Sequence, residues 1–176
     1  MKGGPLVKTS VRLARLSEME TLQKIYDQGQ KFQIKQGNRH QWAPGYPGLA
    51  QIKRDILKNH LFVLVDERDC ILAAMALIAG IDPTYQHIEG RGWLDETSYH
   101  TVHRFVSAGL RRHSGRDLLK WAIGQFGNIR IDTHKANLSM LQLLEDLGFT
   151  HCGRIYLLNG DPREAFQIHL DQGISH

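Results

Sequence analysis

The sequence has few of the features that mark secreted or membrane proteins. Among its 176 residues are two cysteines, Cys70 and Cys152, too few for the disulfide framework of a small secreted domain. The longest uncharged apolar stretch, from Cys70 to Ile81, is too short to cross a bilayer as a helix. Residues 1–10 lack the apolar core of a signal peptide. We therefore expect a cytoplasmic protein without a membrane partner.

Strong charge, metal-ligand spacing and repeats are also missing. The 22 basic and 18 acidic residues leave a net charge of +4, and no basic stripe is interleaved with aromatic residues. Nucleic acid is therefore not an expected partner. Neither HExxH nor paired cysteines occur, so we expect no metal site. The length and the absence of repeats predict a single domain over residues 11–170, with an N-terminal extension (1–10) and a C-terminal tail (171–176).

The hydrophobic pattern predicts an α/β (α+β) fold. Apolar residues recur at helical spacing in four segments, and a capping box of Ser17 and Glu20 is expected to start the first helix. Alternating or continuous apolar runs predict strands at Val11–Leu16, Leu61–Val65, Ile71–Ile78, Tyr99–Val106, Asn128–Thr133, Thr150–Leu157 and Arg163–Leu170. The early strands are expected to pair as antiparallel hairpins, and the later strands alternate with helices. This order favours a mixed sheet with helices on both faces.

The stretch from Tyr99 to Phe149 is the most informative part of the chain. A strand leads into the polar, cationic segment Leu110–Asp117, and apolar residues at helical spacing follow. Free N–H groups at the start of a helix, the helix dipole and arginine side chains all favour a bound phosphate. This order of elements predicts a nucleotide-type cofactor, and with it an enzyme.

The same stretch resembles the GNAT N-acetyltransferase superfamily, whose members transfer acetyl groups from acetyl-CoA to amines. The signature of the family is Arg or Gln, two residues, Gly, one residue, then Gly or Ala. Arg112 and Gly115 match the first two positions, and Asp117 replaces the small third residue. A shifted alignment puts Gly115 third, with His113 in place of the first Gly.

Features on both sides of this loop extend the resemblance. Downstream, Asn137 can cap a helix that closes with Gly148 and Phe149, a recurrent set in the family. Upstream, Gln41-Trp42 and Gly45-Tyr46-Pro47 resemble a bacterial subgroup whose substrates are mostly unassigned. The resemblance runs from about Val11 to Leu170. It implies the GNAT fold, a mostly antiparallel sheet of about seven strands whose fourth and fifth strands part at their ends.

The resemblance also implies where acetyl-CoA, the co-substrate, would bind. The thioester carbonyl would accept a hydrogen bond from the backbone near Phe105 or Val106, and the pantetheine arm would contact Asn137. The residues implied to bind acetyl-CoA are Phe105, Val106, Arg111, Arg112, His113, Ser114, Gly115, Arg116, Asp117, Thr133 and Asn137.

Proton transfer in such a reaction needs a base for the amine and an acid for the thiolate. The base candidates are His100, His103, His134 and Glu89, with His103 favoured by its place on the fourth expected strand. Many family members take the acid from a Tyr that corresponds to Leu144, so this chain departs from the pattern. The expected walls of the acceptor pocket are Trp42, Tyr46, Tyr85 and Trp93.

Several functions remain open on the sequence alone. The leading expectation is an N-acetyltransferase that acts by direct attack of a primary amine, carried by a small molecule or a peptide N-terminus. An acyltransferase that uses another acyl-CoA is an alternative. Leu144 and the imperfect loop also allow a non-catalytic acyl-CoA-binding module. The oligomeric state is open, a homodimer included.

Overall fold

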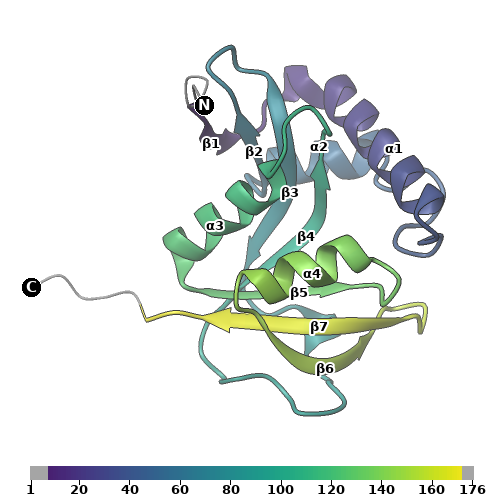
Figure 1. Ribbon diagram of the computed structural model, residues 1–176, viewed down its shortest axis with the longest axis vertical. Helices are drawn as coiled ribbons and strands as arrows, with labels where there is room; N and C mark the ends of the chain where they lie inside the picture. The colour runs from purple at the N-terminus through teal and green to yellow at the C-terminus, as the bar shows by residue number, and fades with distance from the viewer. Residues whose placement is uncertain (1–7, 172–176) are drawn as a thin grey trace, which may run out of the picture.

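The computed structural model describes residues 8–171, so most of the predicted N-terminal extension and C-terminal tail lies outside the described residues. Seven strands form one sheet in the order β1-β2-β3-β4-β5-β7-β6 (Figure 1). The elements are β1 (Ser10–Leu13), η1 (Leu16–Glu18), α1 (Met19–Lys35), α2 (Leu49–Leu57), β2 (Leu61–Val65), β3 (Ile71–Ala79), η2 (Pro83–Tyr85), β4 (His100–Ser107), α3 (Ser114–Phe126), β5 (Asn128–Thr133), α4 (Leu138–Asp146), β6 (Thr150–Tyr156) and β7 (Pro162–His169). In the described range, no helix is long and apolar enough to span a membrane.

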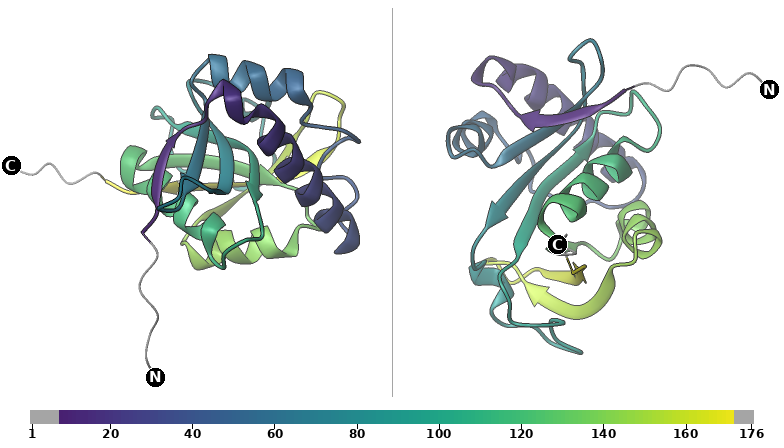
Figure 2. Two further views of the ribbon diagram at one scale, coloured as in Figure 1. Left: turned by 90° about the horizontal axis from the view of Figure 1, so that it is seen from above. Right: turned by 90° about the vertical axis from the view of Figure 1, so that its left-hand side faces the viewer.

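The sheet is mixed and mostly antiparallel, as predicted. Only β4 and β5 run parallel, and every other neighbouring pair is antiparallel. Helices α1 and α2 cover one face and α3 and α4 the other, which the two views of Figure 2 show. Strand β3 lies between these layers, so its continuous apolar sequence is buried on both faces.

The start of the first helix differs from the prediction. Strand β1 ends at Leu13, a 3-10 turn follows, and α1 begins at Met19, so the Ser17–Glu20 capping box was wrong. Glu18 instead accepts a hydrogen bond from the backbone N–H of Arg15 at 2.8 Å. Its carboxylate also accepts two hydrogen bonds of 2.8 Å from Arg12. This bidentate contact fixes Glu18 ahead of the helix, which a local capping pattern cannot anticipate.

The parting of β4 and β5 is the feature of the fold that positions the site. These strands pair at only three positions, the last of which is Val102 with Ile131. On its other side, β4 pairs Ala74 with Val106 and Ala76 with His103, so β4 has an extra residue there. Such a bulge bends a strand and increases its twist. The backbone of β4 beyond Val102 is therefore free of β5, as the family resemblance implies.

The end of α4 confirms the predicted stop signal. The N–H of Phe149 donates to the carbonyl of Leu144 at 2.9 Å, and that of Gly148 donates to Glu145 at 3.0 Å. This pair of bonds is a Schellman motif, and it requires a left-handed residue that glycine adopts most readily. Gly148 has a φ of 87°. The motif directs the chain from α4 into β6.

Gly153 joins the segment after η2 to the edge of the sheet, and we expect its replacement by Ala to destabilise the protein. A Cβ at Gly153, whose φ is 143°, would lie 1.9 Å from the carbonyl oxygen of Glu89. Two backbone hydrogen bonds between Glu89 and Arg154, of 2.9 and 2.8 Å, would then be lost or displaced. Backbone strain and these bonds together should lower the free energy of unfolding by at least about 2 kcal/mol in urea.

A matched control lies in the same hairpin. Gly160 also has a positive φ, 89°, but a Cβ there would meet nothing within 4 Å. Gly160→Ala should therefore lower the free energy of unfolding by only about 1 kcal/mol, the energy needed to hold alanine in a left-handed backbone conformation. Equal losses in the two variants would contradict the close approach of Glu89 to Gly153.

Candidate active site

Two cavities meet where β4 and β5 part. The first has a volume of about 650 Å³ and lies between β4, the end of β5, residues 37–48 and the β6–β7 hairpin. The second, of about 510 Å³, lies between α1, β4, the start of α3 and α4. Four residues line both cavities, namely Gln33, Trp42, Phe105 and Met140. Two ligands entering from opposite sides could therefore meet at the gap.

His103 faces the first cavity and is held by an aspartate. It is the first residue of β4 beyond the last pair with β5, and its Nε2 lies 2.7 Å from Oδ2 of Asp82. The other oxygen of Asp82 accepts hydrogen bonds from the N–H and the hydroxyl of Thr84 at 2.9 and 2.7 Å. The carboxylate therefore has fixed partners on both oxygens.

These partners keep Asp82 ionised. Burial alone would raise the pKa of Asp82, but the hydrogen bonds from His103 and Thr84 lower it to about 2. The stability gained from this carboxylate is therefore present above its ordinary pKa of about 4 and is lost as the pH falls towards about 2. Over the neutral range, His103 faces a permanent negative charge.

A second carboxyl lies across the gap from His103. Continuing the parallel register by one position places Asp132 opposite His103, so both side chains lie on the same face of the sheet. The hydroxyl of Tyr85 donates a hydrogen bond to Oδ1 of Asp132 at 2.6 Å. Burial raises the pKa of Asp132, and the charge of His103 and the bond from Tyr85 oppose this rise.

The irregular segment 37–48 closes one wall of the first cavity. Arg163 of β7 donates hydrogen bonds to the carbonyls of His40 and Gln41 at 2.6 and 3.2 Å. The side-chain oxygen of Gln41 accepts from the hydroxyl of Thr133 at 3.2 Å and from the N–H of His134 at 3.0 Å. These bonds tie the segment to the ends of β5 and β7.

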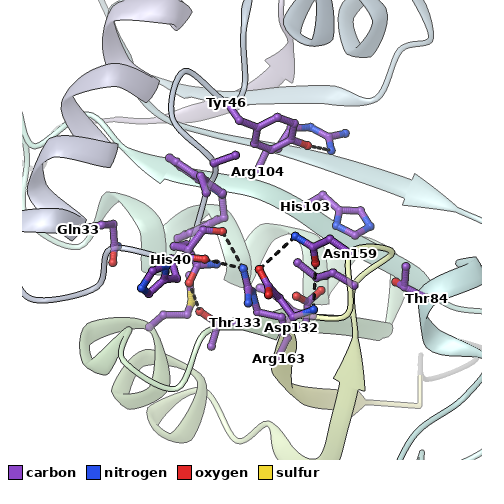
Figure 3. Close-up of a pocket in the computed structure, with 18 of the residues that line it drawn as sticks. Gln33, His40, Tyr46, Thr84, His103, Arg104, Asp132, Thr133, Asn159 and Arg163 are labelled. Atoms are coloured by element: carbon purple, nitrogen blue, oxygen red, sulfur yellow. Dashed lines mark hydrogen bonds between the residues drawn. The ribbon is translucent and has the colours of Figure 1, made fainter.

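A buried ion pair holds the bulge of β4. Arg104, with a φ of 50°, donates two hydrogen bonds to Asp55 of α2, at 2.6 and 2.9 Å. Arg104 also donates to the hydroxyl of Tyr46 at 2.9 Å, and its own carbonyl accepts from Tyr26 at 2.7 Å. Figure 3 shows Tyr46 and Arg104 above the cavity, with Asp132 and Arg163 below it. The bulge is thus anchored to both α1 and α2.

The start of α3 forms one end of the second cavity. The N–H groups of Ser114, Gly115 and Arg116 have no hydrogen-bond partner within residues 8–171. Nη1 of Arg111 is likewise buried without a partner in that range. A Cβ on Gly115 would lie 2.8 Å from the ring of Phe105, so only glycine lets the helix start approach β4 this closely. Unpaired donors at a helix N-terminus fit an anionic group such as a pyrophosphate.

The arginines of this loop are less free than the sequence indicated. Arg111 forms an ion pair with Asp117 at 2.5 Å, and Arg116 forms one with Asp146 at 3.1 Å. Arg112 is exposed and has no partner among the described residues. Unpaired backbone N–H groups are therefore more numerous here than unpaired arginine side chains.

Asn137 caps α4 at the rim of the second cavity, as predicted. Its side-chain oxygen accepts from the N–H of Met140 at 3.4 Å, and its amide nitrogen donates to the hydroxyl of Thr133 at 3.1 Å. An amide nitrogen has two hydrogens, and only one is used in this contact. The other hydrogen remains available to a ligand in the cavity.

The structure separates the predicted aromatic residues into two groups. Trp42 and Tyr46 line the first cavity, whereas Tyr85 and Trp93 do not. The indole of Trp93 donates to the carbonyl of Tyr85 at 2.8 Å, and the guanidinium of Arg130 lies 4.2 Å from the Trp93 ring. Tyr85 and Trp93 thus pack beneath the site, where Tyr85 contacts Asp132 through its hydroxyl and His103 through its ring.

The other base candidates line neither cavity. Nδ1 of His134 accepts a hydrogen bond from the N–H of Ala136 at 3.0 Å, and burial lowers the pKa of His134. Glu89 accepts a hydrogen bond from the hydroxyl of Tyr156 at 2.8 Å. The ring of His100 stacks on Phe126 at 3.9 Å. Of the candidates named from the sequence, the structure brings only His103 to the gap.

Sequence reasoning missed Asp82 and Asp132, which flank His103. Asp82 lies 21 positions before His103, in a segment without a regular pattern. Asp132 lies near the end of the strand Asn128–Thr133, whose apolar residues are Ile129 and Ile131, and an acidic residue at that position was the only available signal. In the described range, no three His, Cys, Asp or Glu side chains form a metal-binding group.

Comparisons with known proteins add a structural likeness. No protein-family profile matches the chain, and no curated protein matches it. A GNAT-family acetyltransferase from Streptococcus agalactiae 2603 is 26% identical, with 93% of this chain and 96% of that chain covered and a TM-score of 0.82.

Two further solved structures share the fold. The NatC complex bound to Gag peptide and CoA matches with a TM-score of 0.61 and 12% identity, covering 93% of this chain and 99% of that chain. The ribosomal-protein-S18-alanine N-acetyltransferase from Escherichia coli matches with a TM-score of 0.62 and 10% identity, covering 96% and 98%. These two matches show a shared fold. The likeness to the streptococcal enzyme, together with the parting of β4 and β5 and the loop before α3, supports membership of the GNAT N-acetyltransferase superfamily.

Proposed function

We propose that the chain is an acetyl-CoA-dependent N-acetyltransferase that acts on a primary amine of a small molecule or a peptide by direct attack. The observation that carries this proposal is the position of His103, held by Asp82, at the gap where the two cavities meet. One cavity would take the acceptor and the other acetyl-CoA. The family and the CoA-bound NatC structure support acetyl-CoA as the co-substrate.

His103 would act as the base that takes the amine proton. With Asp82 ionised, Nε2 of His103 carries the proton that it donates to the carboxylate. Nδ1 then keeps its lone pair and can accept a proton from the amine. Asp82 is a positioning residue in this scheme, because it fixes the tautomer and the orientation of the ring.

Acetyl-CoA supplies an activated acyl group, and the residues of the second cavity are suited to hold it. The unpaired N–H groups of Ser114, Gly115 and Arg116 would receive the pyrophosphate, together with the orphaned Nη1 of Arg111. Asn137 would contact the pantetheine arm. Phe105 and Val106 line this cavity on the freed part of β4, where a backbone N–H could stabilise developing negative charge.

Release of free thiol from acetyl-CoA, measured with a panel of amines and short peptides, tests the proposal directly. Turnover with at least one acceptor supports it. Binding of acetyl-CoA, seen as a raised melting temperature but without turnover, would favour a non-catalytic module. Turnover with a longer acyl-CoA and none with acetyl-CoA would favour another acyltransferase.

We expect Asn137→Asp to lower the affinity for acetyl-CoA while preserving stability. Asp keeps an oxygen that can cap α4 and accept from the Thr133 hydroxyl, so the free energy of unfolding should change by less than about 1 kcal/mol. It removes the free amide hydrogen and adds a negative charge beside an anionic ligand. Calorimetric titration should show a clear loss of affinity. An equal loss of stability and affinity would mean that Asn137 serves only as a cap.

A further inference from the structure

We propose that Asp132 is the acid that protonates the leaving thiolate. This inference rests on the proposed function and concerns the same site. It fills a gap in the chemistry, because Leu144 occupies the position from which many family members supply a tyrosine. Leu144 is fully buried among the apolar residues of the core and lines neither cavity.

The geometry places Asp132 where such an acid would be needed. It follows Ile131, the last residue of β5 that pairs with β4, and it lines the first cavity. The next residue along β5, Thr133, contacts Asn137 at the rim of the second cavity. Asp132 thus lies in the wall of the first cavity, one residue before the strand end that contacts the second, on the strand that faces the freed part of β4.

Burial of Asp132 favours the neutral form of its carboxyl group over the ionised form. Tyr85 donates to Oδ1, so this hydrogen bond leaves Oδ2 free to carry a proton. Four charged or titratable groups face the carboxyl, namely His103 of β4, Asp82 ahead of η2, Tyr85 of η2 and Arg163 of β7. Burial raises the pKa of Asp132, while His103, Tyr85 and Arg163 limit this rise and Asp82 adds to it.

The proton cycle closes within the site. His103 takes a proton from the amine as the N–C bond forms, and Asp132 gives a proton to sulfur as the C–S bond breaks. His103 is then protonated and Asp132 is ionised. Because each residue directly follows the last β4–β5 pair and the charge of His103 acts on Asp132, a proton can return from His103 to Asp132, directly or through water. The sum of these steps consumes one amine and one thioester and yields one amide and one thiol.

Asp132→Asn is the central test, because Asn can still accept the bond from Tyr85. We expect a fall of about tenfold in kcat, a modest effect because a thiol with a pKa of about 8.5 leaves readily even without an acid. The decisive sign is the pH profile. The decline of kcat at high pH, where the acid loses its proton, should disappear, while the decline at low pH should stay.

Tyr85→Phe gives a second test, because it should shift the pH profile in one direction only. The hydrogen bond from Tyr85 stabilises the ionised carboxylate, so its removal should raise the pKa of Asp132 and move the high-pH decline upward. Asp161→Asn is the matched control, since Asp161 lines the same cavity from the β6–β7 hairpin. This control should keep the high-pH decline where it is in the wild type.

Carboxyl-carbon NMR of the free protein gives a readout that needs no turnover. The Asp132 signal, identified by its absence in Asp132→Asn, should titrate at higher pH than the other aspartates. Titration with the others would overturn the proposal. So would an Asn variant that raises KM for the amine but keeps kcat and the high-pH decline, because Asp132 would then bind the ammonium group. Absence of wild-type turnover would instead count against the proposed function.

Discussion

The His103→Gln variant should lose at least about 100-fold in turnover, since a general base contributes about 10²- to 10⁴-fold. Glutamine is polar and of similar size, so it should preserve the packing at the gap and the contact with Asp82, but it does not titrate. The affinity for acetyl-CoA should be retained, because His103 does not line the second cavity. Steady-state kinetics with a responsive amine and calorimetric titration with acetyl-CoA separate the two effects.

The pH dependence sharpens this test. The limb of kcat/KM that rises with pH should disappear in His103→Gln, unless the ionisation of the amine itself produces it. Repeating the profile with an amine of different basicity distinguishes these cases. His87→Gln is the matched control, because His87 is exposed in the same loop as Asp82 and lines neither cavity.

A second variant separates the role of Asp82 from that of His103. Asp82→Asn keeps a polar side chain but removes the charge that fixes the tautomer, so kcat should fall with little change in KM. If His103→Gln stays within a few-fold of the wild type, His103 is not the base. Asp132, His134 and Glu89 should then be replaced in the same way.

Local patterns in the sequence predict most of the secondary structure. The strand Asn128–Thr133 appears with the predicted bounds, and Gly148 ends α4 with the expected motif. Both features depend on residues that are close in sequence. The capping box at Ser17 failed for the opposite reason, because Arg12 and Asp69, 57 positions apart, form an ion pair and the same Arg12 also binds Glu18.

The chemistry of the gap was less predictable, because it depends on register and on the paths of loops. The sequence places His103 on a strand but does not show that Asp82 contacts it. The arginines around the start of α3 resemble free cations in the sequence, yet Asp117 pairs with Arg111 and Asp146 pairs with Arg116. Asp146 comes from a different helix, so only the tertiary structure brings it to the loop.

The aromatic residues show the same limit. Trp42 and Tyr85 both lie in segments without a regular pattern, and the sequence gives no reason to separate them. The structure places Trp42 on the wall of the cavities, edge-on to Tyr26. It buries Tyr85 almost completely, at 1% exposure, with its hydroxyl bonded to Asp132. Large rings in loops therefore indicate a pocket but not which of them face it.

We expect Asp55→Ala to lower the free energy of unfolding by about 3–5 kcal/mol, because it leaves the guanidinium of Arg104 buried without its partner. The side chains of Asp55 and Arg104 are 4% and 11% exposed, so water cannot replace the lost carboxylate readily. Asp69→Ala is the matched control. Like Asp55, Asp69 forms ion pairs, in its case with Arg12 and Arg15, but its side chain is 47% exposed. Its loss should therefore lower the free energy of unfolding much less.

The double variant Asp55→Ala/Arg104→Met distinguishes an unpaired charge from lost packing. If the buried charge dominates, removing both partners should restore at least half of the stability lost in Asp55→Ala, as measured by urea unfolding. If the double variant is less stable than Asp55→Ala, the aliphatic part of Arg104 and its bond to Tyr46 dominate instead. Because Arg104 lies in the bulge that frees β4 from β5, the double variant should also reduce turnover even where stability recovers. Full turnover in a stable double variant would show that the bulge keeps its shape without the ion pair.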